Sequence, residues 1–134
     1  MNLQITVVIT ILVAGLGCQD VATIWTAEAK SPDGKWVALA TTRQHGGPGT
    51  AGVETGVELR RTDDPHQSQL ILGVFHDPNS TFPKINLTMT WLSLSHLDIA
   101  YEGRATLTFQ VVKYQGVDIS VHEISTVTSN PTAQ

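Results

Sequence analysis

The sequence predicts a small all-β domain, an antiparallel β-sandwich or a curved meander of about eight strands that follows an apolar N-terminal segment. Three observations predict this fold class. Apolar residues make up 41% of the 134 residues, and charged residues make up only 15%. Short runs of alternating apolar and polar residues follow one another, separated by Gly, Pro, Asn and Asp. After the N-terminal segment, no stretch has the apolar period of a capped helix.

The N-terminal segment, residues 1–17, has the composition of a signal peptide. Its apolar run, residues 5–16, is shorter than the ~20 residues that a membrane-spanning helix needs. The only cysteine of the chain, Cys18, follows directly in "AGLGC". This stretch resembles the lipobox of bacterial lipoproteins, which implies a diacylglycerol on the sulfur of Cys18, cleavage before Cys18 and palmitate among the attached acyl chains. Gly15 stands where a lipobox usually has Leu, and Gly15 and Gly17 also suit the ordinary signal peptidase. Secretion with a free thiol therefore stays the alternative.

The expected domain organisation follows from these boundaries. We expect a lipoprotein-type signal peptide over 1–17, a tether over 18–22, one β-domain over 23–124 and a flexible tail over 125–134. With one cysteine in the chain, an intramolecular disulfide is excluded, so an apolar core must stabilise the domain. The expected location is the cell envelope, on its periplasmic or extracellular face.

Eight alternating runs predict the strands of the β-domain. They cover residues 23–29, 35–43, 53–61, 69–75, 85–92, 96–101, 105–113 and 117–124. The turn "SPDG" places Pro second and Gly fourth, as in a type I turn, and "YEGR" and "YQGV" place Gly at tight reversals. The period of two predicts the buried side chains. They are Leu39 or Val37, Leu59, Leu72, Leu87, Met89, Trp91, Ile99, Phe109, Val111 and Ile119.

Two local patterns resemble known families. "SPDGKWVALA" is similar to the strand motif of TolB-type β-propeller blades, but the chain is too short for the four blades of a complete propeller. "SPDGK", "GPGTAGVETGVEL" and "W…LDIAY" occur in the order of a family of small uncharacterised bacterial lipoproteins and membrane-anchored proteins. This resemblance covers residues 31 to about 124. It implies membrane anchorage and no known activity, and the loop cysteine of that family is replaced here by Gly47.

The glycine-rich stretch "RQHGGPGTAG", residues 43–52, looks like the oxyanion-hole loop of α/β-hydrolases. Such a loop works beside a nucleophile and a base, and the nucleophile lies in Gly-x-Ser-x-Gly. The sequence has no such motif and no alternation of strands and helices. We therefore interpret the stretch as a flexible connection between two strands.

The remaining candidate residues give no catalytic motif. The five histidines have no metal-ligand spacing, so we expect no metal and no cofactor. Most acidic residues occupy polar positions of alternating strands, and the turn explains Ser31 and Asp33. Trp36, Tyr101 and Tyr114 are the residues we expect on an aromatic binding surface. The net charge of −4 and the scattered basic residues argue against a nucleic-acid partner.

These observations favour a non-enzymatic binding or scaffolding domain, anchored to a membrane by lipid on Cys18 and with an envelope protein as a candidate partner. The alternative is a small secreted or periplasmic enzyme, hydrolase-like, whose site is assembled from residues far apart in the sequence. A third reading makes the chain a unit that completes the sheet of a partner through an exposed edge.

Overall fold

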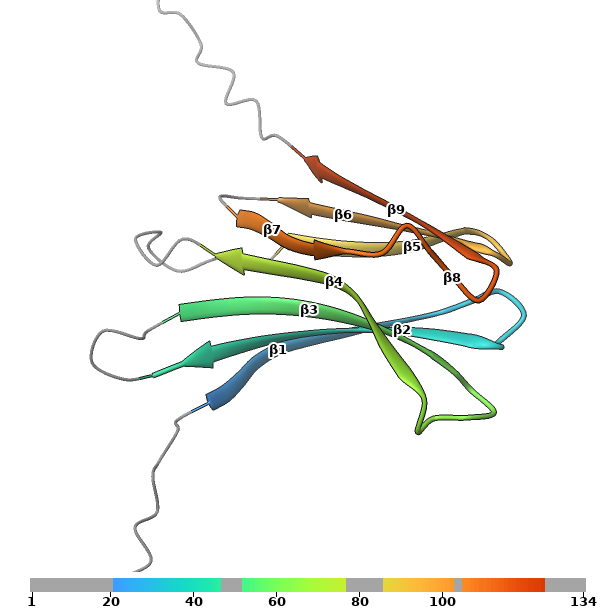
Figure 1. The fold of residues 1–134 in the computed structure, drawn as a ribbon, viewed down its shortest axis with the longest axis horizontal. Helices are drawn as coiled ribbons and strands as arrows, with labels where there is room; N and C mark the ends of the chain where they lie inside the picture. Colours follow the sequence, from blue (N-terminus) through green and yellow to red (C-terminus); the bar gives the residue numbers. More distant parts are fainter. Residues whose placement is uncertain (1–20, 47–51, 77–85, 103–104, 125–134) are drawn as a thin grey trace, which may run out of the picture.

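In the part of the chain that the structure describes, nine strands form two sheets, which lie face to face (Figure 1). The structure is a computed structural model that describes residues 21–46, 52–76, 86–102 and 105–124. The predicted signal peptide, Cys18, the centre of the glycine-rich loop and the tail lie outside the described residues. No helix occurs in the described part, and none there is long and apolar enough to cross a membrane. The predicted all-β class is confirmed.

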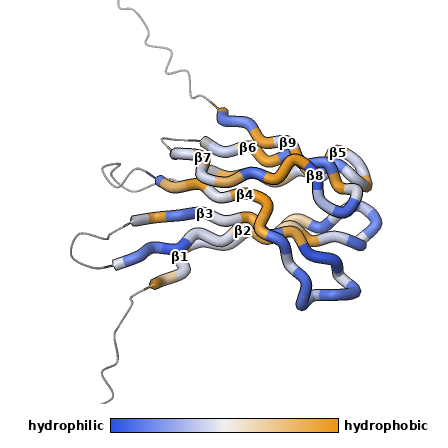
Figure 2. The backbone as a smooth tube through the Cα atoms, viewed as in Figure 1, coloured by the Kyte–Doolittle hydropathy of each residue, from blue (hydrophilic) through white to orange (hydrophobic). Residues whose placement is uncertain are grey.

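The first sheet has five strands in the order β1-β2-β3-β4-β7, and all its pairs are antiparallel. Hairpins connect β1 to β2 and β3 to β4, and their hydrophilic tips stand out in Figure 2. The strands are β1 (Val21–Lys30), β2 (Trp36–His45), β3 (Gly52–Arg61), β4 (Ser68–His76) and β7 (Ala105–Gln110). Strand β1 therefore begins two residues earlier than expected, inside the predicted tether.

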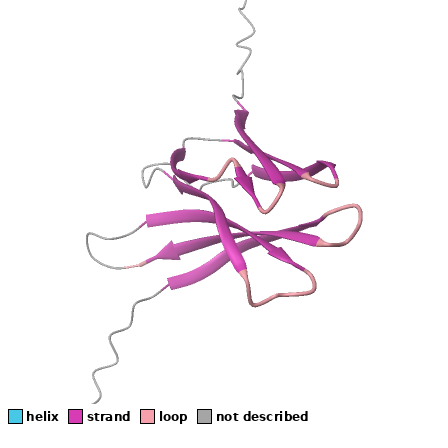
Figure 3. Ribbon diagram, turned by 45° about the vertical axis from the view of Figure 1, so that its right-hand side comes forward, coloured by secondary structure: helices cyan, strands magenta, loops and turns pink. Residues whose placement is uncertain are grey.

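The second sheet has four strands in the order β5-β6-β9-β8. These are β5 (Asn86–Ser93), β6 (His96–Glu102), β8 (Lys113–Tyr114) and β9 (Val117–Ile124). Figure 3, coloured by secondary structure, shows strands and loops but no helix among the described residues. Strands β6 and β9 are parallel, with Asp98 opposite Ser120. A parallel pair needs a long crossover, and here the crossover runs through β7 and β8.

The predicted strand over residues 105–113 is divided between the two sheets. Strand β7 pairs with β4, and the N–H of Val111 still donates to the carbonyl of Ile71. The next residue, Val112, accepts a hydrogen bond from the N–H of Ile119 in the second sheet. The chain therefore changes sheets between Val111 and Val112. Such a change of sheet makes a corner that joins one side of a sandwich.

The core lies between the two sheets and is formed by the inward side chains of both. Val37, Leu59, Leu72, Leu87, Ile99 and Ile119 are buried as predicted, whereas Met89, Trp91 and Val111 are half-buried at its margin. The buried apolar cluster consists of Ala38, Ala40, Val57, Leu59, Ile71, Leu72, Val74, Leu87, Leu97, Ile99, Val117 and Ile119.

The predicted burial of Phe109 is wrong, because its side chain is 43% exposed. A β-bulge shifts the register between β4 and β7, so that Gly73 pairs with Phe109 while the next residue, Val74, pairs with Leu107. The extra residue, Thr108, interrupts the alternation that the sequence pattern assumes. Phe109 therefore lies opposite Gly73 on the outer face of the first sheet.

Candidate functional site

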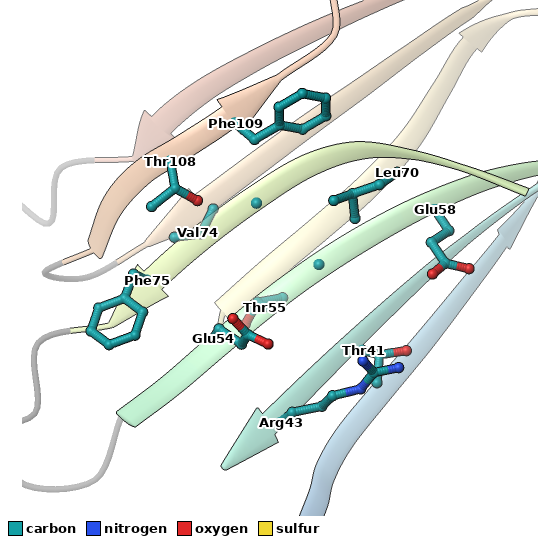
Figure 4. A pocket seen from close by; sticks show the side chains of 12 residues that line it. Thr41, Arg43, Glu54, Thr55, Glu58, Leu70, Val74, Phe75, Thr108 and Phe109 are labelled. Atoms are coloured by element: carbon teal, nitrogen blue, oxygen red, sulfur yellow. The ribbon is translucent and has the colours of Figure 1, made fainter. Parts of the chain in front are cut away.

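A trough crosses the outer face of the five-stranded sheet, and we call it the cross-strand trough (Figure 4). Its volume is about 320 Å³, at the small end of the range for ligand pockets. Its lining comes from β2, β3, β4 and β7. The lining residues are Thr41, Arg43, Glu54, Thr55, Gly56, Glu58, Leu70, Gly73, Val74, Phe75, Thr108 and Phe109.

Two glycines that pair across β3 and β4 form the floor of the trough. Gly56 lies opposite Gly73 in the register, so this row of the outer face has no side chain at two neighbouring positions. A Cβ at Gly73 would lie 2.9 Å from Oγ1 of Thr108, and one at Gly56 would lie 3.2 Å from Cδ1 of Leu70. Glycine at these positions lets the neighbouring side chains close over the backbone.

The rows on either side of the glycines form the walls. Glu54 pairs with Phe75 on one side, and Glu58 pairs with Leu70 on the other. Residues that pair between strands form rows that cross the sheet, so the trough between two such rows also crosses the strands. One end of the trough is polar and the other end is apolar. Phe109, opposite Gly73, closes the apolar end.

The apolar end consists of Leu70, Phe75 and Phe109, which come from β4 and β7 (Figure 4). These side chains are 42%, 40% and 43% exposed, although each is large and hydrophobic. Three such side chains around one depression form a patch that an apolar group can cover.

The polar end consists of Thr41 and Arg43 on β2 and of Glu54 and Glu58 on β3 (Figure 4). Glu54 is 3.0 Å from Nε2 of His45, so its carboxylate has a partner. Among the described residues, neither Arg43 nor Glu58 makes an ion pair. The three charged side chains give this end a net charge of −1, from two carboxylates and one guanidinium.

A buried polar chain lies on the inner face of the same strands. The hydroxyls of Thr42 and Thr55 are 2.7 Å apart, and that of Thr55 is 2.8 Å from Nε2 of His76. All three residues are buried. Burial lowers the pKa of His76, because the low-dielectric interior disfavours the imidazolium ion. No buried side-chain nitrogen or oxygen of the described residues lacks a hydrogen-bond partner.

A second cluster lies on the outer face of the four-stranded sheet, where β6 and β9 are neighbours. Ser120 Oγ donates to Asp98 Oδ1 at 2.6 Å and is 2.9 Å from Nε2 of His96. His122 Nδ1 is 3.4 Å from the same carboxylate oxygen. Ser, His and Asp are the residues of a hydrolase triad, but here the serine hydroxyl donates its hydrogen bond to the carboxylate and not to a histidine. His96 then acts as the donor to Ser120 and not as its base.

The sequence patterns contain signals for both the cluster around Asp98 and the cross-strand trough. "HLD" and "SVH" place His96 with Asp98, and Ser120 with His122, on one face of their strands, yet only the parallel pairing of β6 and β9 brings the two pairs together. Glycine inside a strand often marks a close approach, so Gly56 and Gly73 are the signal for the trough.

The three residues of the expected aromatic surface are divided between two places. Trp36 and Tyr114 meet edge to face, with ring centroids 6.3 Å apart, and the guanidinium of Arg61 lies 5.9 Å from the Trp36 ring. Tyr101 pairs with Glu123 of β9, whereas Tyr114 pairs with Val117 of the same strand. These two partners are six residues apart. Six residues of a strand span about 20 Å. Burial, with the nearby Glu123 carboxylate, raises the pKa of Tyr101.

The turn over residues 31–34 has the local role expected of it. The hydroxyl of Ser31 donates to Asp33 at 2.7 Å and accepts from the N–H of Trp36 at 3.0 Å. The hydrogen bond from Ser31 lowers the pKa of Asp33, with a further bond from the N–H of Lys35. Both side chains are therefore engaged in holding the hairpin.

Among the described residues, no group of three or more His, Cys, Asp or Glu side chains is arranged to hold a metal ion. No protein-family model, curated protein or solved structure shows significant similarity to this chain.

Proposed function

We propose that this chain is a binding protein of the bacterial cell envelope, held at a membrane by lipid on Cys18, which takes its ligand in the cross-strand trough. The trough is the observation that carries the binding role. It combines a depression of about 320 Å³ with exposed apolar side chains at one end and charged side chains at the other. A few convergent polar groups beside an apolar surface are typical of ligand sites.

The apolar end supports binding through the hydrophobic effect. A ligand group seated over Gly73 covers Leu70, Phe75 and Phe109 together. If it removes about 100 Å² of apolar surface from water, it contributes about 2.5 kcal/mol. Arg43 and Glu58 then orient the ligand, because one of these two opposite charges is complementary to a charged ligand group at the polar end.

The membrane attachment is supported by the sequence and by where the first strand begins. Only Gln19 and Asp20 separate Cys18 from β1, which begins at Val21. Lipid on Cys18 would therefore hold the sandwich close to the membrane surface. A single acyl chain anchors reversibly, whereas two or three chains anchor stably. No observation in the described residues favours the enzyme alternative over a binding role.

The binding role is tested by filling the floor of the trough. Gly56→Ala adds a methyl group that only the flexible end of Leu70 must avoid, so the fold is retained. Thr26→Val is the matched control, because Thr26 is an exposed residue of the same sheet, on β1, that does not line the trough.

The probes are 3-phenylpropylamine and 3-phenylpropionate, which share a ring and differ in charge. In ¹H–¹⁵N spectra we expect one of them to shift the amide signals of Gly56, Gly73 and Phe109. Gly56→Ala should weaken binding by about tenfold, equal to 1.4 kcal/mol, and Thr26→Val should leave it unchanged. Equal binding to both variants would contradict a ligand site in the trough.

The membrane attachment is tested separately, by expressing the full chain and Cys18→Ser in a bacterium. The native chain should partition into detergent and carry the mass of a diacylglyceryl group on Cys18. Release of both forms as the same soluble species would replace the lipoprotein by an ordinary secreted protein.

A further inference from the structure

We infer that the outer edge of β7 pairs with an extended strand of a partner polypeptide, whose side chains then cover the apolar end of the trough. The inference rests on the proposed function, since it names the class of ligand that the trough takes. The features that carry it are the position of β7 in the sheet, its composition and its distance from the glycine floor.

Strand β7 ends the five-stranded sheet and pairs with β4 alone. Within the described residues, no backbone hydrogen bond is made on its other side. Its backbone N–H and C=O groups on that side are therefore open to a new strand. We call this side the β7 edge.

The composition of β7 does nothing to prevent such pairing. Its sequence, "ATLTFQ", has no charged residue and no proline, and every residue after Ala105 is exposed. Leu107 and Phe109 are 40% and 43% exposed. Natural proteins usually protect an edge strand with lysine, proline or a covering segment. The one irregularity of β7 is the bulge at Thr108, on the side that faces β4.

The opposite edge of the same sheet, β1, is protected. Lys30 ends the strand and places a charge at this edge. The indole N–H of Trp91, from β5, donates to the carbonyl of Ala29 at 3.2 Å. At one edge, a side chain of the second sheet therefore occupies a backbone carbonyl next to a charged residue, while the other edge is uncharged and exposed.

The occupant is an extended polypeptide with an apolar side chain at every second position. A strand added to β7 lies about 4.8 Å away, so one of its outward side chains stands beside Phe109. That side chain continues the apolar end formed by Leu70 and Phe75. Since β7 carries no charge, main-chain hydrogen bonds and apolar contacts carry the affinity, as in other strand-addition complexes.

The length of the edge favours a peptide over a second copy of the chain. Strand β7 has six residues, which is enough for a bound peptide strand. A stable symmetric dimer needs about 800 Å² from each partner, more than one short strand supplies. A second copy is therefore an outcome that the test must detect, and it would overturn the inference.

The test uses an array of capped seven-residue peptides with Val, Ile, Leu or Phe at odd positions and Thr or Ser at even positions. A second array carries the same side chains with every second backbone nitrogen methylated, which removes the donors along one edge. The protein is the full chain in detergent, as the wild type, as Thr106→Lys and as Thr26→Lys. Both threonines are exposed residues on edge strands of the same sheet, so Thr26→Lys is the matched control.

We expect the wild type and Thr26→Lys to bind the first array and not the methylated one, with little change between 50 and 500 mM salt (about a factor of two). Thr106→Lys should lose binding by about tenfold or more. With a bound peptide, alternate amides of β7 should gain protection from hydrogen exchange.

Four outcomes overturn the inference. Equal binding to both arrays, abolished by Gly56→Ala, would keep the trough as a site for side chains and reject the added strand. Protection of β7 amides that rises with protein concentration in the absence of peptide would assign the edge to a second copy. Equal binding by Thr106→Lys and the wild type would place the peptide elsewhere. Failure of both arrays while the phenyl probes still bind would reject a peptide ligand and leave the proposed function intact.

Discussion

The cluster around Asp98 and the buried polar chain of Thr42, Thr55 and His76 lie on opposite faces of their respective sheets. The four-stranded sheet is arranged as expected for a solvated sheet, with Leu97, Ile99 and Ile119 inside and the cluster around Asp98 and Ser120 outside. In the five-stranded sheet, Thr42, Thr55 and His76 form a hydrogen-bonded chain on the inner face. On its outer face, large apolar side chains form one end of the trough and charged side chains form the other.

This difference distinguishes polar side chains that stabilise the fold from surface side chains that can bind a ligand. Polar side chains that are buried and fully hydrogen-bonded serve the fold, because water cannot replace a missing partner. Large apolar side chains that stay about 40% exposed around one depression form a patch, and a binding function explains such a patch. The five-stranded sheet has both features at β3 and β4, and it is there that we place the binding site.

The largest expected effect comes from breaking the buried chain at its centre. Thr55→Val keeps the shape of the side chain but removes the hydroxyl that contacts both Thr42 and His76. We expect the free energy of unfolding to fall by about 1–3 kcal/mol, the cost of leaving buried polar groups without partners. Urea unfolding measures it, with Thr26→Val as control. A change below about 0.5 kcal/mol would mean that the chain contributes little to stability.

An intermediate effect is expected from pH. Burial holds the pKa of His76 below its ordinary value of 6.5, so below pH 6.5 the unfolded chain binds a proton more readily than the folded one. The free energy of unfolding should therefore decrease as the pH falls through 6.5, by up to about 1.4 kcal/mol per pH unit. His76→Gln should remove this dependence, and His66→Gln, an exposed loop variant, should keep it. A profile identical in wild type and His76→Gln would contradict the assignment.

The smallest effect is expected on the outer face of the other sheet. Ser120→Ala removes the donor to Asp98 and the acceptor from His96, but these groups are only half-buried and water can replace the lost partner. Destabilisation of about 0.5–1 kcal/mol is expected in the same unfolding experiment. A decrease in the free energy of unfolding as large as that of Thr55→Val would show that the cluster around Asp98 and the buried polar chain stabilise the fold equally.

The alternating pattern predicted most of the fold from the sequence. All eight predicted runs contain strands, and six of the ten residues or pairs predicted as buried, such as Leu59 and Ile99, are buried. The pattern failed for Phe109, because a bulge changes which face a residue occupies without changing the residue types around it. It also gave no sign that residues 105–113 change sheets, since both sheets receive alternating side chains.

The candidate site was less predictable than the fold. The trough depends on Gly56 and Gly73 lying opposite each other, and strand register is not encoded in either strand alone. The cluster around Asp98 depends in the same way on the parallel pairing of β6 with β9. The residue types of Trp36 and Tyr114 predict an aromatic binding surface, but the structure packs these two rings against each other.

The passage of one chain segment from sheet to sheet has a consequence for how the protein folds. Strands β7 and β8, which lie between β6 and β9 in the chain, belong to different sheets. The parallel pairing of β6 with β9 therefore joins residues distant in sequence across a segment that both sheets share, and these contacts must be made together. Folding should be a single cooperative transition on the millisecond to second scale (about the range of other β-sandwiches). A chain cut between Val111 and Val112 would leave all five strands of the first sheet in one fragment but would divide the second sheet, with β5 and β6 in that fragment and β8 and β9 in the other.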